Sequence, residues 1–166
     1  MLKMFDKHVV QAWRTEKFSD GKAINHRKKT DEQGFLVYPD GIFEAKLIGY
    51  EDVPCRDGRV VSKGRLLLPK NSGFAAGHTH PRGHEAKPGP LDGVLAKSRA
   101  SYDSAAYMIG YKGAYRIEFS SEANLYYITT LAGSNINQRS IKKLNRDWSR
   151  VRSRGSFRND DDYVCQ

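Results

Sequence analysis

The sequence predicts a mixed α+β domain in which helices flank a central, largely antiparallel sheet. Short apolar runs recur between turn signals through the middle of the chain, and amphipathic helical patterns stand near both ends. The chain has 166 residues, of which 39% are hydrophobic, so one core and one domain over residues 1–166 are expected. No apolar run approaches the about 20 residues of a membrane helix, so we expect no membrane span.

The first half of the chain is predicted to form one helix followed by strands. Apolar residues recur at helical spacing from Phe5 to Trp13, which predicts a helix over residues 3–17 before a basic loop. The tripeptide Pro39-Asp40-Gly41 separates two strand-like runs, and Asp-Gly tolerates the positive φ of a tight hairpin turn. The strands predicted in this half cover residues 35–38, 42–50, 59–68 and the short run 75–77.

The second half begins with a loop rich in proline and glycine and ends in a basic helix. Pro90 precedes apolar residues at helical spacing, so we expect a helix to begin there. The next predicted elements are strands at residues 105–110, 114–119 and 125–130. A last helix, within a basic segment at residues 135–158, is predicted by an apolar stripe formed by Ile141, Leu144, Trp148 and Val151.

The net charge of +9 belongs to the two flanks of the chain. Residues 1–30 hold eight basic and three acidic groups, residues 31–138 hold twelve of each, and residues 139–158 hold eight and one. Residues 159–166 form an acidic tail. The chemistry is therefore expected in the neutral middle. The last helix carries three candidate contacts to a polyanion, Arg146, Arg150 and Arg154, but no nucleic-acid-binding motif accompanies them, so nucleic acid is not the favoured partner.

The cysteines and the start of the chain bear on the compartment. Cys55 and Cys165 lie far apart in the sequence and in no metal-ligand spacing, so we expect no disulfide framework and a reducing compartment. Charged residues interrupt the apolar ones throughout residues 1–17, so no signal peptide is predicted. We expect a cytoplasmic protein, or one exported by a signal-peptide-independent secretion system.

The residues with the clearest chemical meaning are two histidines and an aspartate. His78 and His80 follow a short strand and, being two residues apart, point to the same side. Imidazole suits Zn²⁺, and a catalytic zinc ion takes three protein ligands and keeps one position open. Asp92, at the start of the next helix, is the third candidate ligand, with favourable first-turn charge as its structural alternative. His84 is either a loop residue or a substitute ligand.

A zinc hydrolase also needs a general base, and Glu32 is the best candidate. It precedes the strand that starts near Gly34, although its position alone does not distinguish it from Glu44 or Glu51. A family resemblance of the stretches around it distinguishes it.

An upstream Glu, a His-Thr-His-Pro sequence and an Asp at a helix start resemble the JAB/MPN (JAMM) zinc metallopeptidases. The pattern is most similar to the JAB-like domains at the ends of bacterial Rhs-type polymorphic toxins. The matching stretches are Glu32-Gln33-Gly34, Tyr38-Pro39-Asp40-Gly41, Gly77-His78-Thr79-His80-Pro81, Pro90-Leu91-Asp92 and the two strands from Ala105 to Phe119, within a JAB-like core at residues 31–130.

The resemblance implies a JAB/MPN-like fold, a Zn²⁺ cofactor held by His78, His80 and Asp92, and activation of a water molecule by Glu32. The family has a Ser three residues before its Asp, which helps to stabilise the oxyanion. Gly89 occupies that position in this chain and offers a backbone N–H but no hydroxyl.

Two hypotheses about function follow. The first is a zinc-dependent peptide or isopeptide hydrolase, acting as a bacterial antagonistic effector toxin with a cognate immunity protein as a partner. The second is a JAB-like binding module with weakened catalysis, which docks a protein or a polyanion through its basic flanks. A metal-dependent nuclease is a weaker third hypothesis.

Overall fold

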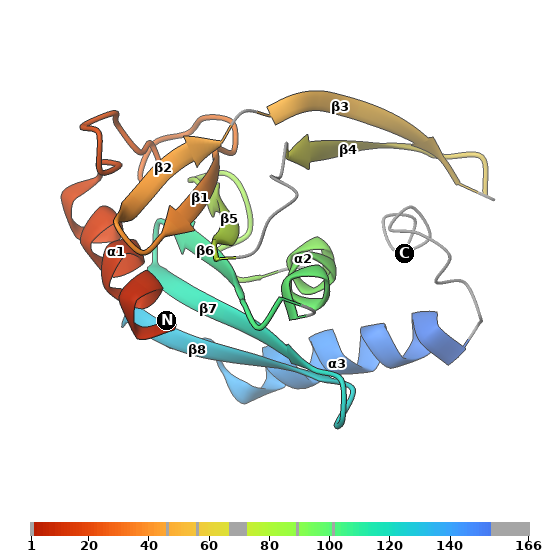
Figure 1. Cartoon of the computed structure of the whole chain (residues 1–166). Coiled ribbons are helices and arrows are strands. Elements are labelled where there is room, and N and C mark those ends of the chain that lie inside the picture. Colours follow the sequence, from red (N-terminus) through yellow and green to blue (C-terminus); the bar gives the residue numbers. More distant parts are fainter. Residues whose placement is uncertain are drawn as a thin grey trace.

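The computed structural model describes residues 2–45, 47–55, 57–66, 73–88, 90–100 and 102–153. This part of the chain contains three helices and eight strands, which confirm the α+β class (Figure 1). The elements are α1 (Leu2–Thr15), β1 (Gly34–Tyr38), β2 (Gly41–Ala45), β3 (Leu47–Pro54), β4 (Val60–Leu66), β5 (Ala75–His80), α2 (Pro90–Ala100), β6 (Ala106–Gly110), β7 (Gly113–Ser120), β8 (Leu125–Gly133) and α3 (Gln138–Ser153).

Six of the strands form one sheet in the order β2-β1-β5-β6-β7-β8. Only the β5 and β6 pair is parallel, and the other neighbours in this sheet are antiparallel, as the sequence predicted. A parallel pair requires a crossover connection, and α2 provides it. The connection leaves β5 at its carboxyl end, where the two histidines lie, and the first turn of α2 lies near this end.

The predicted second arm of the hairpin is divided in the structure. The hairpin pairs β1 with β2 from Gly34↔Ala45 to Tyr38↔Gly41, so its second strand ends at Ala45 rather than at residue 50. The next residues form β3, which pairs with β4 in a separate two-stranded sheet. The sequence shows a continuous run of strand formers, but strand propensity does not say which sheet a strand joins.

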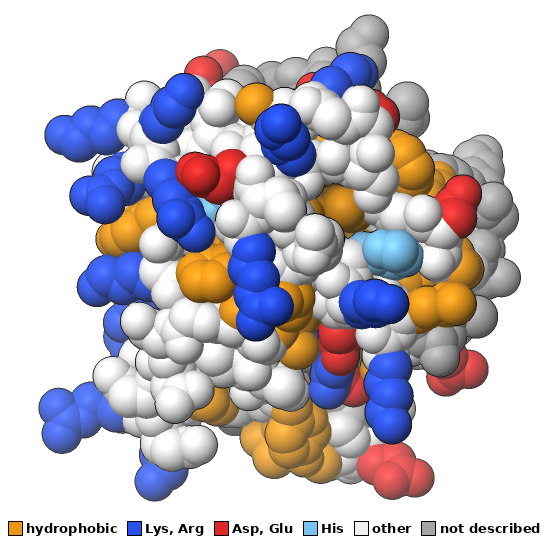
Figure 2. Space-filling view, turned by 90° about the vertical axis from the view of Figure 1, so that its left-hand side faces the viewer, with side chains coloured by type: hydrophobic (Ala, Val, Ile, Leu, Met, Phe, Trp, Pro, Cys, Tyr) orange, Lys and Arg blue, Asp and Glu red, His pale blue; other side chains and the backbone are white. Residues whose placement is uncertain are grey.

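Basic side chains are abundant on the side of the molecule formed by α1 and the loop after it (Figure 2). The exposed residues of α1 and its end include Lys3, Lys7, Arg14 and Lys17. Two further cations of the loop have acidic partners, since Lys22 pairs with Asp20 at 3.9 Å and Arg27 pairs with Glu16 at 3.7 Å. This side corresponds to the first of the two basic flanks.

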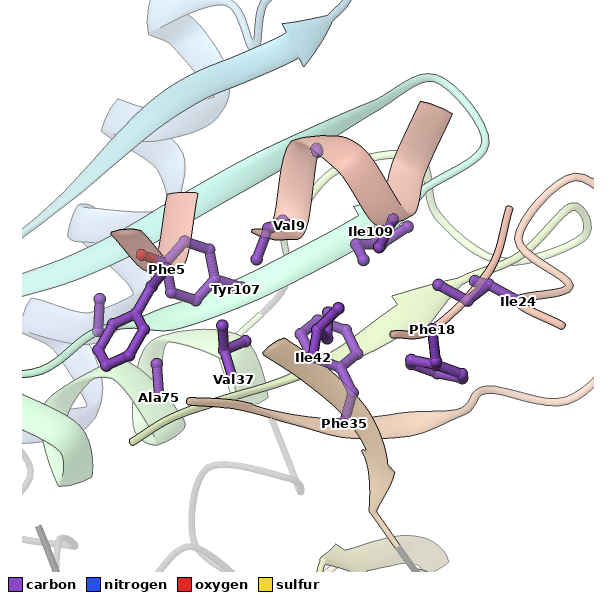
Figure 3. Packing of buried hydrophobic residues seen from close by; sticks show 13 residues of the cluster. Phe5, Val9, Phe18, Ile24, Phe35, Val37, Ile42, Ala75, Tyr107 and Ile109 are labelled. Atoms are coloured by element: carbon purple, nitrogen blue, oxygen red, sulfur yellow. The ribbon is translucent and has the colours of Figure 1, made fainter. Parts of the chain in front are cut away.

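One face of the six-stranded sheet is covered by α1. Phe5 and Val9 of the helix point into a cluster that includes Phe35, Tyr107 and Ile109, all of them fully or almost fully buried (Figure 3). The other face is covered by α2 and α3, where Ala96 and Leu144 belong to a cluster that includes Ala106, Met108 and Ile117. Successive residues of β6 therefore alternate between the two clusters, as the two-residue period of a strand requires.

The same alternation applies to β5. Ala75 belongs to the cluster under α1, so Gly77 and Thr79 share that face, whereas His78 and His80 face the side of α2. Gly77 is needed for close packing, because a Cβ there would lie 2.3 Å from the carbonyl oxygen of Tyr107 and 2.5 Å from the Phe35 ring.

Two other expectations concern the cysteines and the membrane. Cys55 is disulfide-bonded, which contradicts the expectation of no disulfide. Cys165 lies outside the described residues. Within the described residues, no helix has the length and apolar character needed to cross a membrane.

We predict that Gly77→Ala destabilises the fold by about 2–3 kcal/mol, because the added methyl group meets a backbone carbonyl that cannot move independently of β6. The measurement is urea unfolding of the purified protein. Gly21→Ala is the control, because no atom lies within 4 Å of its Cβ and only the backbone strain of its φ of +89° remains, at about 1 kcal/mol. Equal losses in the two variants would contradict the packing explanation.

Candidate metal centre

The pairing of three elements brings the predicted site residues together. β1 runs antiparallel to β5 with Gly34 opposite His78, so the same register places Glu32 beside His80. The N–H of Thr79 donates to the carbonyl of Gln33 at 2.8 Å, which extends this pairing beyond the end of β1. Asp92 lies in the first turn of α2 and is 3% exposed. The site is thus assembled at the carboxyl end of β5 from segments before, within and after it.

The two imidazoles and Asp92 converge on one point. His78 Nε2 lies 3.0 Å from His80 Nε2 and 2.5 Å from Asp92 Oδ1. His80 Nε2 lies 3.5 Å from Asp92 Oδ2. Ligand atoms about 2.0–2.1 Å from a tetrahedral zinc ion are separated by about 3.3–3.4 Å. The separations that involve His80 lie on either side of this value, whereas the His78–Asp92 contact is a hydrogen-bond distance, so these donors could hold a small divalent cation once the Asp92 carboxylate moves back from His78.

Glu32 provides a second carboxylate beside the same imidazoles. Its Oε1 lies 3.9 Å from His80 Nε2, and one ligand atom each from Glu32, His78 and His80 lie within 4.8 Å of one another. The Glu32 side chain is 40% exposed, whereas that of Asp92 is 3% exposed. Two sets of three donors are therefore available. Asp92 is the nearer and more buried carboxylate, and Glu32 faces solvent.

His84 contacts Glu32 at the rim of the centre. Its Nδ1 lies 3.7 Å from Glu32 Oε1, and its Nε2 lies 3.2 Å from the carbonyl oxygen of Thr30. Asp92, by contrast, reaches both imidazoles. This geometry makes His84 a neighbour of the candidate base, and Asp92 is the better candidate for the third ligand.

Hydrogen bonds around the centre fix the orientation of its groups. His80 Nδ1 lies 2.9 Å from the carbonyl oxygen of Glu85, so its Nε2 is turned toward His78 and Asp92. A metal-binding histidine commonly donates its other ring N–H in this way. The backbone N–H of Gln33 donates to the hydroxyl of Thr79 at 2.8 Å, on the opposite face of β5 from the imidazoles.

Sequence reasoning had not assigned roles to Gln33, Thr79 and Glu85. The Gln33 side chain accepts from the N–H of Asn25 at 2.8 Å and donates to Glu44 at 3.0 Å, so it joins the basic loop to β2. The only sequence signal for Thr79 is its place between two histidines, which puts its side chain on the other face. Nothing local distinguishes Gln33 or Glu85.

Burial and close charges shift the pKa values of the site in opposite directions. Burial lowers the pKa of His80, but the hydrogen bond and charge of Asp92 outweigh it and raise this pKa to about 9. The pKa of His78 is raised for the same reasons. Burial raises the pKa of Asp92, but the two histidines outweigh it and hold this pKa below its usual range. Without a metal ion, the cluster is thus held together as an ion pair between imidazolium and carboxylate.

The remaining predicted site residues lie elsewhere or outside the described residues. Arg146 is exposed on α3 and, together with Arg139 and Lys142, lines a groove of about 360 Å³. Arg150 belongs to α3, but its side chain is not among the parts that the structure describes. Gly89 and Arg154 lie outside the described residues.

Comparison with known proteins adds no assignment. The chain matches no protein-family model, and no curated protein or solved structure matches it significantly. The functional interpretation therefore rests on the residues of this chain and their geometry.

We predict that the chelator-treated protein loses stability as the pH rises from about 6.5 to 9. A histidine whose pKa is raised from 6.5 to about 9 on folding stabilises the protein fully below pH 6.5 and no longer above pH 9, a change of about 3 kcal/mol for His80. The lowered pKa of Asp92 acts at the other end, because its contribution is present above about pH 4 and is lost as the pH falls further.

Urea unfolding in EDTA at several pH values measures this effect. His80→Gln is expected to remove most of the loss of stability between pH 6.5 and 9. The control is His8→Gln, which changes a histidine of α1 that is hydrogen-bonded to the carbonyl oxygen of Pro39 and should leave this loss unchanged. A wild-type stability that is constant between pH 6.5 and 9 would contradict the ion-pair description.

Proposed function

We propose that this chain is a zinc-dependent hydrolase of peptide or isopeptide bonds with a JAB/MPN-like core. The observation that supports it is the convergence of His78 Nε2, His80 Nε2 and the buried Asp92 carboxylate on one point, with Glu32 beside them. The order of these groups along the chain agrees with the motif resemblance, in which the Glu precedes the histidines and the Asp follows them.

Each residue has a distinct role in this proposal. His78, His80 and Asp92 hold the ion, and the carbonyl of Glu85 keeps the ring of His80 in the required orientation. A zinc ion bound there supplies Lewis-acid chemistry, which activates water and polarises a carbonyl group. Glu32 takes the proton of the attacking water and delivers it to the leaving nitrogen as the C–N bond breaks. Its greater exposure suits this role, because the base must reach both water and substrate.

The position of the family Ser bears on the rate. Gly89 has no side chain to donate to an oxyanion, so that position offers only its backbone N–H. We therefore expect slower turnover than in a Ser-bearing relative. Complete loss of activity with retention of the fold would correspond to the binding module, the second hypothesis.

The resemblance to toxin-borne JAB-like domains favours a role as a bacterial antagonistic effector. A cognate immunity protein would then be the physiological partner. Co-purification with the product of a neighbouring small gene tests this role independently of the chemistry.

We predict that the protein purified from zinc-replete medium contains one zinc ion per chain. His78→Ala and Asp92→Ala should lose it, because each removes a converging donor. Glu32→Gln should keep the ion and lose hydrolysis by about 10²–10⁴-fold, as expected for removal of a general base. Elemental analysis measures the zinc, and a pool of quenched fluorescent peptides, together with lysine-isopeptide-linked versions, measures hydrolysis.

His8→Ala is the matched control, since this histidine lies on α1 and should affect neither zinc nor activity. A metal-free wild-type protein, or a Glu32→Gln variant with full activity, would contradict the proposal. Cleavage of plasmid DNA instead of peptides would point to the nuclease.

We also predict that Thr79→Val lowers hydrolysis while zinc is retained. The substitution removes the hydroxyl that accepts the N–H of Gln33, the residue after Glu32, so the base loses part of its positioning. Thr79→Ser keeps the hydroxyl and should restore the rate. Zinc content and kcat of the three proteins are the measurements, and a loss of zinc in parallel with activity would argue for a structural defect of β5 instead.

A further inference from the structure

A strip of cations and aromatic rings lies beside the candidate metal centre, just beyond the ends of β5 and β6. His80 is opposite Gly110 in the parallel pair, so the residues after these two positions emerge at the same edge of the sheet. Arg82 follows on one side, and Tyr111 and Lys112 follow on the other. The guanidinium of Arg82 lies 5.8 Å from the centre of the Tyr111 ring, and Lys112 Nζ lies 6.0 Å from the same centre.

Two distant segments extend this strip. Lys29, from the basic loop, forms a parallel backbone bridge with Arg82. Trp13 of α1 donates its indole N–H to the carbonyl of Gly110 at 3.0 Å, so its ring lies next to the start of the Tyr111 segment. The cationic side chains of the strip are exposed, whereas both rings are half-buried and therefore fixed in position.

The cations of this strip differ from others in the protein. Among the described residues, no carboxylate lies within ion-pair distance of Lys29, Arg82 or Lys112, whereas Arg27, Lys22 and Arg116 each have an acidic partner. The face of the Tyr111 ring attracts both exposed cations and keeps two positive charges near one point of the surface. A carboxylate that approaches this ring therefore meets donors for charge-assisted hydrogen bonds.

We propose that Lys29, Arg82 and Lys112 form a subsite for carboxylate side chains of the substrate, so that the hydrolase prefers acidic segments of polypeptide next to the scissile amide. This inference rests on the proposed function, because a polypeptide is the macromolecule that an amide hydrolase must hold. Arg82 is two residues from His80, so an acidic residue bound by it lies close to the reacting bond. The basic side of the molecule extends the attraction to longer range (Figure 2).

The test compares two fluorescent peptides that differ only in charge, one with Asp and Glu residues and one with Asn and Gln in their places. Fluorescence anisotropy at low and high salt measures their binding to the zinc-loaded Glu32→Gln protein, which holds the peptides without cleaving them, and the further variants are made in the same background. The acidic peptide is expected to bind more tightly, and the double variant Arg82→Ala, Lys112→Ala is expected to lose about three- to tenfold in affinity for it alone. The control is Lys3→Ala, Lys7→Ala, which removes two exposed cations of α1.

Three outcomes would overturn the subsite: equal binding of the two peptides, an equal loss in the α1 control, or tighter binding of a single-stranded oligonucleotide of matched charge. Failure of the proposed function is distinguishable from these outcomes. Zinc content and the effect of Glu32→Gln on hydrolysis test the metal centre, while the peptide preference is measured without any turnover.

Discussion

The position of β5 between β1 and β6 determines most of the candidate site. This strand is antiparallel to one neighbour and parallel to the other, so one neighbour supplies Glu32 before its start and the crossover to the other supplies Asp92. Gly77 allows the close approach of Tyr107 and Phe35 that this central position demands. Alternation then sends Thr79 toward the face of α1 and the two histidines toward the face of α2, so a single strand both holds the candidate base and presents the candidate ligands.

The buried charge of Asp92 explains why the site must be a cluster. A carboxylate with 3% exposure is costly unless cations or hydrogen-bond donors surround it, and an imidazolium of the His78–His80 pair serves this purpose. A divalent cation would replace its proton and satisfy the same oxygen and nitrogen atoms. Metal binding and proton release are therefore linked at this site, and the group that stabilises the metal-free fold is the one that binds the ion.

Much of the fold, and the common direction of the two histidines, could be predicted from the sequence. Helical spacing gave α1, the Pro39-Asp40-Gly41 turn gave the hairpin, and the two-residue spacing of His78 and His80 gave their common direction. The division of the second hairpin arm at Ala45 was missed because the run of strand-forming residues continues through it. The roles of Gln33 and Glu85 could not be predicted for another reason. Gln33 accepts from the backbone of Asn25, and Glu85 contacts His80 through its backbone carbonyl, so neither contact is visible in the local sequence.

Charge summed along the sequence also hid a local feature. Residues 31–138 are neutral in total, which assigned the net charge to the two flanks and the chemistry to the neutral middle of the chain. Folding brings Lys29 from the basic flank to Arg82, and brings Arg82 to the ring that Lys112 also approaches. Of the acidic residues in that sum, Asp92 is paired inside the site, and Glu32 and Glu85 lie beside it. A neutral segment can therefore still place neighbouring cations beside a candidate metal centre, and this local arrangement, rather than the net charge, is what an approaching substrate would meet.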